Sequence, residues 1–220
     1  MNTGSESWRP KLSRGFSVTE LLIIVATVVL LAAVFLPGYL SPAKPRSKRL
    51  NCTNHMKQIG LAFRCWSLDN NERFPMQLSV TNGGTMELAA GRAVYPHFQI
   101  MSNELSNPKV LVCPQDTQRN YATNFNSLTD ENLSYFLNMD SIEADGAILL
   151  AGDRNITNKP MAGSRLVYIS KAVTLAWTKE MHSEAGNVGF GDGSVNQFRN
   201  QSVRVPIQLE DGVTNRLAVP

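Results

Sequence analysis

The feature that most constrains this chain is an uncharged run near its N-terminus. No residue from Leu21 to Ala43 carries a charge, and fifteen of the sixteen residues from Leu21 to Leu36 are apolar. Counted from Phe16 to Leu36, the stretch makes roughly 31 Å of helix at about 1.5 Å per residue. That length matches the hydrocarbon core of a bilayer, which is about 30 Å thick. We therefore expect one membrane-spanning helix within residues 16–40.

The remainder of the chain has ordinary polarity. The 220 residues are 43% hydrophobic and 18% charged, and there are only three Cys. About 180 residues remain outside the run, the usual size of one globular domain. A polytopic membrane protein, a disordered tail and a disulfide-dense mini-protein are excluded. The net charge of +3 gives no reason to expect nucleic-acid binding.

Glu20 distinguishes this run from a secretory signal peptide. The apolar stretch is longer than the usual signal-peptide core of 7–15 residues, and Glu20 stands in its first turn. A carboxylate in hydrocarbon costs several kcal/mol, so an acid there indicates a function. The alternatives are a plain single-pass anchor and a Glu20 side chain that is simply solvated at the membrane interface.

The residues around Glu20 carry a resemblance. The string Gly15-Phe16-Ser-Val-Thr-Glu20-Leu-Leu follows a short basic segment and resembles the N-terminal motif of type IV prepilins and type II secretion pseudopilins. The resemblance implies a cleavable leader at 1–15, a cut between Gly15 and Phe16 by a prepilin peptidase, and N-methylation of Phe16. Glu20 would then be the fifth mature residue and would pair with the new amine of a neighbouring subunit.

The same resemblance implies the protein's place and partners. It predicts a structural subunit, not an enzyme, in a type IV pilus or type II secretion pseudopilus. The chain would cross the inner (cytoplasmic) membrane once, with its C-terminal domain outside the cytoplasm. Its partners would be the prepilin peptidase/methyltransferase, like subunits or other pseudopilins, and inner-membrane lipid, with no nucleic acid.

The distribution of basic residues opposes this orientation. Lys44, Arg46, Lys48 and Arg49 follow the run, whereas only three basic residues precede it. Positive residues favour the cytoplasmic side, so this count alone would put the C-terminal domain in the cytoplasm. We give the cleavage motif more weight than this count, and we therefore expect the C-terminal domain outside the cytoplasm. We interpret the basic cluster as a solvated helix face beside lipid head groups.

Residues 41–70 are predicted to continue the helix amphipathically. Three prolines should interrupt it, and the helical pattern resumes at about Ser47 and should end near Asp69. Apolar residues then recur every three or four positions, which is typical of one buried helix face. The prolines are Pro37, Pro42 and Pro45, and the apolar positions are Cys52, Met56, Ile59, Phe63 and Trp66.

Residues 71–220 are predicted to form a globular α+β head. A second helix is expected over 94–105. Short apolar runs separated by Gly, Asn and Asp predict strands at 109–113, 133–137, 147–151, 166–170, 173–178, 187–190 and 194–198. The overall prediction is a type IV pilin-like fold, in which a long bent N-terminal helix packs on an antiparallel β-sheet.

The three cysteines allow at most one intrachain bridge. Cys52 lies near the centre of the apolar helix face, Cys65 lies on the opposite face, and Cys113 ends an apolar run. Cys52–Cys113 is the better candidate pair, because the apolar run that ends at Cys113 is expected to pack against the helix face that carries Cys52. Three unpaired thiols remain the alternative, because spacing cannot establish a bridge.

The segment from His182 to Gly193 contains a second motif. Nine residues separate His182 from Asp192-Gly193, and this resembles the H-x(9)-DG pattern at the C-terminal end of many prepilin-type proteins. Asp-Gly is a strong hairpin signal, so we expect strands on both sides of the turn and His182 hydrogen-bonded within the loop. The sharper alternative is a metal site built from Asp153, His182 and Asp192.

Cofactors and catalysis have little basis in the sequence. A calcium ion needs about 6–8 oxygen ligands, and no loop of this sequence has a dense cluster of carboxylates. No other cofactor is expected. A His182/Asp/Ser194 triad exists only in composition. Two alternatives to a pilin-like subunit therefore stay open: a membrane-anchored extracytoplasmic binding module that does not polymerise, and an anchored hydrolase.

Overall fold

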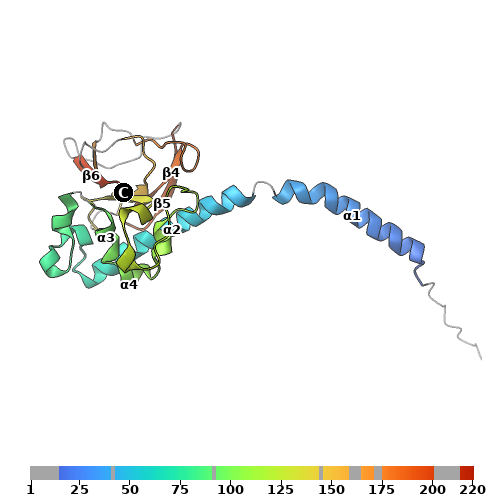
Figure 1. The fold of residues 1–220 in the computed structure, drawn as a ribbon, viewed down its shortest axis with the longest axis horizontal. Coiled ribbons are helices and arrows are strands. Elements are labelled where there is room, and N and C mark those ends of the chain that lie inside the picture. The colour runs from blue at the N-terminus through green and yellow to red at the C-terminus, as the bar shows by residue number, and fades with distance from the viewer. Residues whose placement is uncertain are drawn as a thin grey trace, which may run out of the picture. The chain divides into compact units, whose positions relative to one another are not determined.

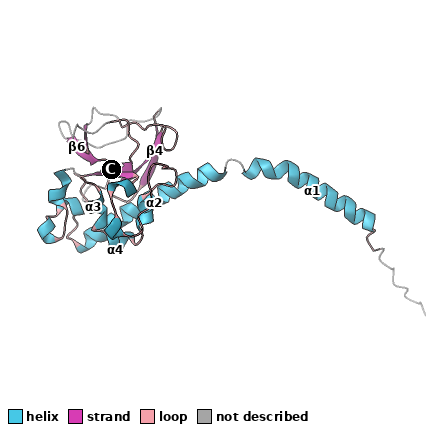
Figure 2. Ribbon diagram, viewed as in Figure 1, coloured by secondary structure: helices cyan, strands magenta, loops and turns pink. Residues whose placement is uncertain are grey.

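The computed structural model describes residues 15–40, 43–90, 93–143, 146–158, 165–170, 175–200 and 214–220. The chain divides into two units, Met1–Pro45 and Arg46–Pro220. The described residues of the first include a long helix, and those of the second include a sheet with helices (Figures 1 and 2).

The described part of the first unit is dominated by α1, Val18–Leu40. Its stretch Val18–Leu36 is long and apolar enough to cross a membrane, and no other described helix is. The expected interruption at Pro37 is wrong, because the helix continues through this residue to Leu40. A proline removes one backbone donor, and here that loss does not end the helix.

Helix α2 spans Ala43–Asp69. It starts earlier than the predicted Ser47, and Pro45 stands in its first turn, where the missing N–H has no helical acceptor to bond. The predicted end at Asp69 is confirmed, and the Asn70 side chain donates to the Trp66 carbonyl there at 2.8 Å. Pro42, the remaining predicted interruption, lies outside the described residues.

The buried face of α2 is the one that the apolar spacing predicts. Its five apolar positions are buried, and Phe63 meets the rings of Phe74 and Phe98 edge-on at 5.5 and 6.2 Å. Leu61, Cys65 and Leu68 are exposed, because they lie on the opposite side of the helix. The helix therefore presents one face to the core of its unit.

Two predicted elements between the helix and the sheet are wrong in detail. The helix expected over 94–105 is two short helices, α3 (Tyr95–Gln99) and α4 (Ser102–Leu105). The strand expected at 109–113 is instead a 3₁₀ turn, Pro108–Leu111, whose start is capped by the Asn107 side chain. Proline at a first helical position and Asn as its cap favour a helical turn over a strand.

Further short 3₁₀ helices complete this region. They are Pro75–Gln77, Val80–Asn82, Met86–Ala90, Phe125–Ser127 and Asp130–Asn132.

The described strands form one six-stranded antiparallel sheet, so the unit is α+β. Its order is β3-β6-β1-β2-β4-β5. The strands are β1 Tyr135–Asn138, β2 Leu149–Asp153, β3 Leu166–Ser170, β4 Ala185–Phe190, β5 Val195–Arg199 and β6 Thr214–Ala218.

Two differences from the predicted strands stand out. Strand β6 was not predicted, because its residues alternate weakly between apolar and polar. Of the strand predicted at 173–178, residues 173–174 lie outside the described part. In the remainder, Trp177 makes only an isolated bridge to Ile156.

Both faces of the central strands β1, β2 and β4 are covered. Successive side chains of a strand point to opposite faces: Tyr135 and Leu137 join the core beneath α2, α3 and α4, whereas Phe136 joins a second core with Trp177. Trp177 stacks on Phe198 there, with ring centroids 6.2 Å apart. This double coverage explains why every residue of β1, β2 and β4 is buried.

The predicted hairpin at the second motif is confirmed. Strands β4 and β5 pair in antiparallel register, from Ala185–Arg199 to Gly189–Val195. Gly193 has a φ of 83° in the turn, a conformation that glycine adopts without strain. A Cβ added at Gly60 of α2 would lie 3.3 Å from the Cα of Gly193, so the turn lies close against this helix.

Candidate functional site

The first candidate site is the start of α1. Glu20 Oε2 accepts a hydrogen bond from the Ser17 backbone N–H at 3.0 Å, and Ser17 Oγ accepts one from the Thr19 N–H at 3.3 Å. A Glu three residues after a Ser is the arrangement of a capping box. Within its own chain, Glu20 therefore has a local role as a helix cap. Phe16, next to Gly15, is 79% exposed.

Residues 21–36 of α1 present an apolar surface on every side. From Leu21 to Leu36 the only polar side chain is Thr27, and its Oγ1 donates to the Ile24 carbonyl at 2.8 Å. Leu22, Val28 and Phe35 are among its large side chains that remain more than half exposed. An apolar surface of this extent indicates a membrane or another protein surface.

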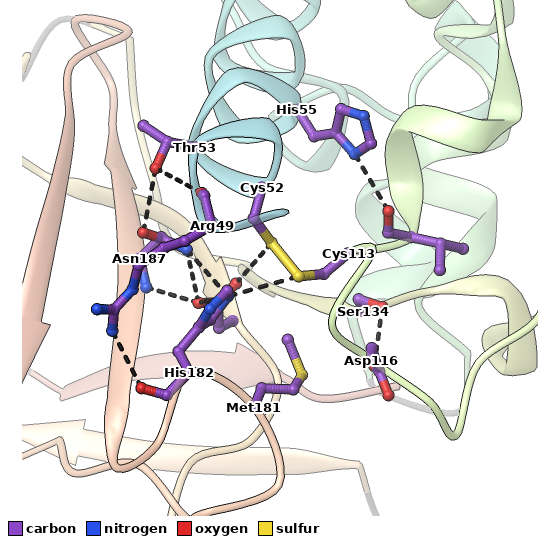
Figure 3. The surroundings of a disulfide bond; sticks show 12 residues. Arg49, Cys52, Thr53, His55, Cys113, Asp116, Ser134, Met181, His182 and Asn187 are labelled. Atoms are coloured by element: carbon purple, nitrogen blue, oxygen red, sulfur yellow. Dashed lines mark hydrogen bonds and ion pairs between the residues drawn. A yellow bond between two sulfur atoms is a disulfide. The ribbon is translucent and has the colours of Figure 1, made fainter. Parts of the chain in front are cut away.

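The second candidate site surrounds a disulfide in the other unit (Figure 3). Cys52 of α2 and Cys113, which follows the 3₁₀ turn Pro108–Leu111, are bonded, with Cα atoms 5.1 Å apart and both residues fully buried. The bond closes 61 residues of sequence separation. It ties α2 to the segment that leads into the sheet.

Polar side chains gather around both sulfurs. Cys113 Sγ lies 3.4 Å from His182 Nε2, and Cys52 Sγ lies 4.0 Å from Asp153 Oδ1. The Tyr135 hydroxyl is 3.4 Å from Cys52 Sγ. His182 Nε2 and Asp153 Oδ2 are 3.4 Å apart, and neither side chain is exposed. The structure thus places two of the three predicted metal ligands, Asp153 and His182, beside the disulfide.

Asn187 of β4 holds these two groups in place. Its backbone N–H and side-chain amide donate to Asp153 Oδ2 at 2.6 and 3.0 Å. The same amide nitrogen lies 3.3 Å from His182 Nε2. An amide has two N–H donors, so Asn187 can bridge the carboxylate and the imidazole.

Burial sets the protonation of this pair. Burial raises the pKa of Asp153 to about 7, against the hydrogen bonds from Asn187 that lower it. Burial lowers the pKa of His182 to about 4, and the nearby charge of Arg49 acts in the same direction. Both shifts favour the neutral form, so we interpret the short His182–Asp153 approach as a polar contact and not as an ion pair at neutral pH.

The backbone fixes the direction of His182. Residues His182, Ser183 and Glu184 have φ values of 53°, 55° and 61°. This is a left-handed backbone conformation that residues other than glycine rarely adopt. Arg49 of α2 donates to the His182 carbonyl at 3.0 Å. His182 was expected to be hydrogen-bonded within its loop, and it does contact Asn187 of the same motif. Helix, disulfide and sheet contact it as well.

Asp192 does not join the other two predicted ligands. It lies in the turn after β4, whereas Asn187 and its partners lie near the start of that strand. Asp192 Oδ1 accepts from the Ser194 N–H at 2.8 Å, and its carbonyl accepts from Arg64 at 3.1 Å. The predicted three-residue metal site is therefore wrong, and Ser194 is likewise placed apart from His182.

A second buried network is structural. Arg154 donates to both carboxylate oxygens of Asp116 at 2.7 and 2.8 Å, and the Ser134 hydroxyl donates to the same carboxylate at 2.8 Å. Burial would raise the pKa of Asp116, but the hydrogen bonds from Arg154 and Ser134 hold it below its ordinary value. The network joins the loop after Cys113 to the ends of β1 and β2.

Sequence reasoning missed several members of the buried cluster. Arg49, Tyr135 and Asn187 contact it from α2, β1 and β4, and no spacing in the chain relates them. Asn187 offered one signal, since it is a polar residue in a strand that is otherwise apolar or glycine. The turn from His182 to Glu184 offered only a weak signal, because His adopts positive φ more often than most residues but Ser and Glu do not.

Comparisons with protein-family models, with curated proteins and with solved structures return no match for this chain. What the structure itself establishes is an α+β protein that has one N-terminal helix able to span a membrane and a six-stranded antiparallel sheet.

Proposed function

We propose that this chain is a prepilin-like or pseudopilin-like subunit of a type IV pilus or type II secretion pseudopilus. It is held in the inner membrane by α1, with the sheet-containing unit outside the cytoplasm. A peptidase cuts between Gly15 and Phe16, and Phe16 is then N-methylated. The observation that carries the proposal is the Gly15–Glu20 motif at the head of an exposed apolar helix.

Electrostatics supports a role for Glu20 between subunits. Cleavage would create a cationic amine at Phe16, and a neighbour's Glu20 is an anion at a similar depth. Two opposite charges 4 Å apart attract by about 4 kcal/mol at an effective dielectric constant of about 20. Pairing would remove two isolated charges from a poorly solvated place and favour one axial stagger.

The disulfide supports the proposed side of the membrane. Disulfides persist mainly in oxidising compartments and are rare in the cytosol. Cys52 and Cys113 are bonded and lie in the unit that the proposal places outside the cytoplasm.

The first test is mass spectrometry of the N-terminal peptide of the natively expressed protein. We expect a mature chain that begins with N-methylated Phe16. The matched variant is Gly15→Val, because a Cβ at Gly15 meets nothing within 4 Å and the fold should be unaffected; it should retain its leader. An unprocessed wild-type chain, or one cut after residue 30, would sink the proposal.

A second test separates the two roles of Glu20. Gln can replace Glu in a capping box, so Glu20→Gln keeps the helix cap but removes the charge, whereas Glu20→Ala removes both. Assembly is measured by chemical cross-linking of membranes, in which the wild type should give a ladder of linked subunits on a denaturing gel. We expect both variants to be processed at Phe16 but to give no such ladder. If Glu20→Gln assembles like the wild type, Glu20 acts as a cap only. If wild-type subunits never cross-link, the chain is an anchored module that does not polymerise.

A further inference from the structure

We propose that the disulfide site is also a redox-gated zinc site. When a dithiol reductant opens the Cys52–Cys113 bond, the two sulfurs, His182 Nε2 and Asp153 Oδ1 bind one Zn²⁺. The inference concerns the sheet-containing unit alone and is independent of the proposed filament function.

The spacing of the ligand atoms carries the proposal. In a tetrahedral site with zinc bonds of about 2.0–2.3 Å, neighbouring ligand atoms lie about 3.3–3.8 Å apart. Cys113 Sγ is 3.4 Å from His182 Nε2, and Cys52 Sγ is 4.0 Å from Asp153 Oδ1. The two sulfurs and the histidine nitrogen all lie within 4.8 Å of one another, whereas Asp153 lies outside this group of three. Once the bond is open, the sulfurs must separate to about 3.8 Å, and Asp153 Oδ1 must move toward them to complete the site.

The chemistry of the four side chains suits zinc. Thiolate, imidazole and carboxylate are its usual protein ligands, and four of them make a closed structural site. All four residues are buried, so no position remains open for a substrate. Calcium and magnesium are disfavoured, because they require a shell made mostly of oxygen.

The surroundings are those of a supported metal site. Asn187 holds Asp153 Oδ2 with two hydrogen bonds, and Oδ1 is the oxygen that lies near Cys52. Arg49 anchors the backbone of His182, and the Tyr135 hydroxyl lies within hydrogen-bonding reach of Cys52 Sγ. Such outer contacts orient metal ligands and tune their affinity.

Reduction of the disulfide and binding of zinc need no reactant beyond the dithiol and the Zn²⁺ ion. The reductant's two thiols lose two electrons and two protons and become a disulfide, while the Cys52–Cys113 bond accepts them and becomes two thiols. Zn²⁺ then displaces both thiol protons, which are released to water. The link between α2 and the segment at Cys113 is thus covalent when oxidised and metal-mediated when reduced.

The test is metal titration of the full chain in detergent, on a Cys65→Ser background that removes the exposed third thiol. After reduction by a phosphine, we expect one Zn²⁺ per chain and none in the oxidised protein. Co²⁺ should give the absorption of a tetrahedral site with thiolate ligands. His182→Ala and Asp153→Asn should each weaken zinc binding by at least about 100-fold, more than outer contacts usually account for.

The matched control is His55→Ala. His55 lies one turn from Cys52 and bonds to the Val112 carbonyl at 3.1 Å, but it is not among the proposed ligands, so zinc affinity should stay within about threefold. Circular dichroism of the oxidised forms checks that each variant folds. The proposal is overturned if the reduced wild-type chain takes up no zinc, if the oxidised chain binds it equally, or if the folded ligand variants keep wild-type affinity.

Discussion

Reducing the Cys52–Cys113 disulfide should sharply destabilise the sheet-containing unit. The bond joins α2 to the segment before the sheet across a fully buried contact. In the oxidised protein, an unfolded chain must still keep these two points together. Reduction frees them, so the unfolded state gains conformational entropy while the folded packing is largely retained.

The size of the effect follows from the length of the closed loop. A sequence separation of 61 residues corresponds to a loop-closure entropy of about 14 cal/mol/K, or about 4 kcal/mol at 25 °C. For a domain of 150–250 residues, each kcal/mol shifts the melting temperature by roughly 2–4 °C. We therefore expect the reduced protein to melt about 8–16 °C lower than the oxidised protein.

Thermal unfolding followed by near-ultraviolet circular dichroism measures this shift. Both redox forms are compared in detergent with EDTA present, so that no zinc can replace the lost bond. Cys65→Ser serves as the control and should melt like the wild type in each redox state, because Cys65 is exposed and unbonded. A reduced protein that melts within 2 °C of the oxidised one would refute the reasoning.

Three further perturbations have defined outcomes. Arg154→Met leaves Asp116 as an uncompensated buried charge and should lower the free energy of unfolding by about 3–5 kcal/mol, most of which returns when Asp116→Asn is added; urea unfolding measures both. Burial lowers the pKa of His97 from 6.5 to about 4. The stabilisation that neutral, buried His97 gives the folded protein is therefore fully present above about pH 6.5 and is lost as the pH falls toward 4. Between pH 7 and pH 4 the wild type should therefore lose about 3 kcal/mol more than His97→Gln. Gly186→Ala would drive a Cβ into the ring of Trp177 and should cost about 1–3 kcal/mol, visible as a lower urea midpoint.

Each of these has a contradicting result. An Arg154→Met loss that persists in the double variant would show that the arginine acts through packing and not through charge. Parallel pH profiles for the wild type and His97→Gln would mean that the pKa of His97 is the same in the folded and the unfolded protein. An unchanged midpoint for Gly186→Ala would mean that the indole ring can move aside.

Local patterns predicted the elements that local physics determines. The apolar spacing from Cys52 to Trp66 identified the buried face of α2, and the string Asp69-Asn70-Asn71 identified its end. The Asp192–Gly193 pair identified the hairpin, because a tight turn needs a residue at positive φ. Both signals lie within a few turns or residues of the structure that they specify.

One local signal was missed: Asn107-Pro108 starts a 3₁₀ turn in an apolar run that otherwise suits a strand.

Longer-range features could not be found from local patterns. The approach of His182 to Asp153 depends on a left-handed turn and on Asn187. These contacts arise from the order of the strands in space, which the sequence pattern does not contain.

That strand order has a consequence for how the protein is made. In the described sheet, β6 (Thr214–Ala218) lies between β3 and β1, and β3 pairs with no other described strand. During synthesis, β1 and β3 both emerge long before the segment that joins them. Pairings between distant segments form slowly, and here they must also wait for translation to reach Ala218. The sheet therefore cannot close until β6 has been synthesised and has left the ribosome, and before that β1 and β3 have no strand to join them.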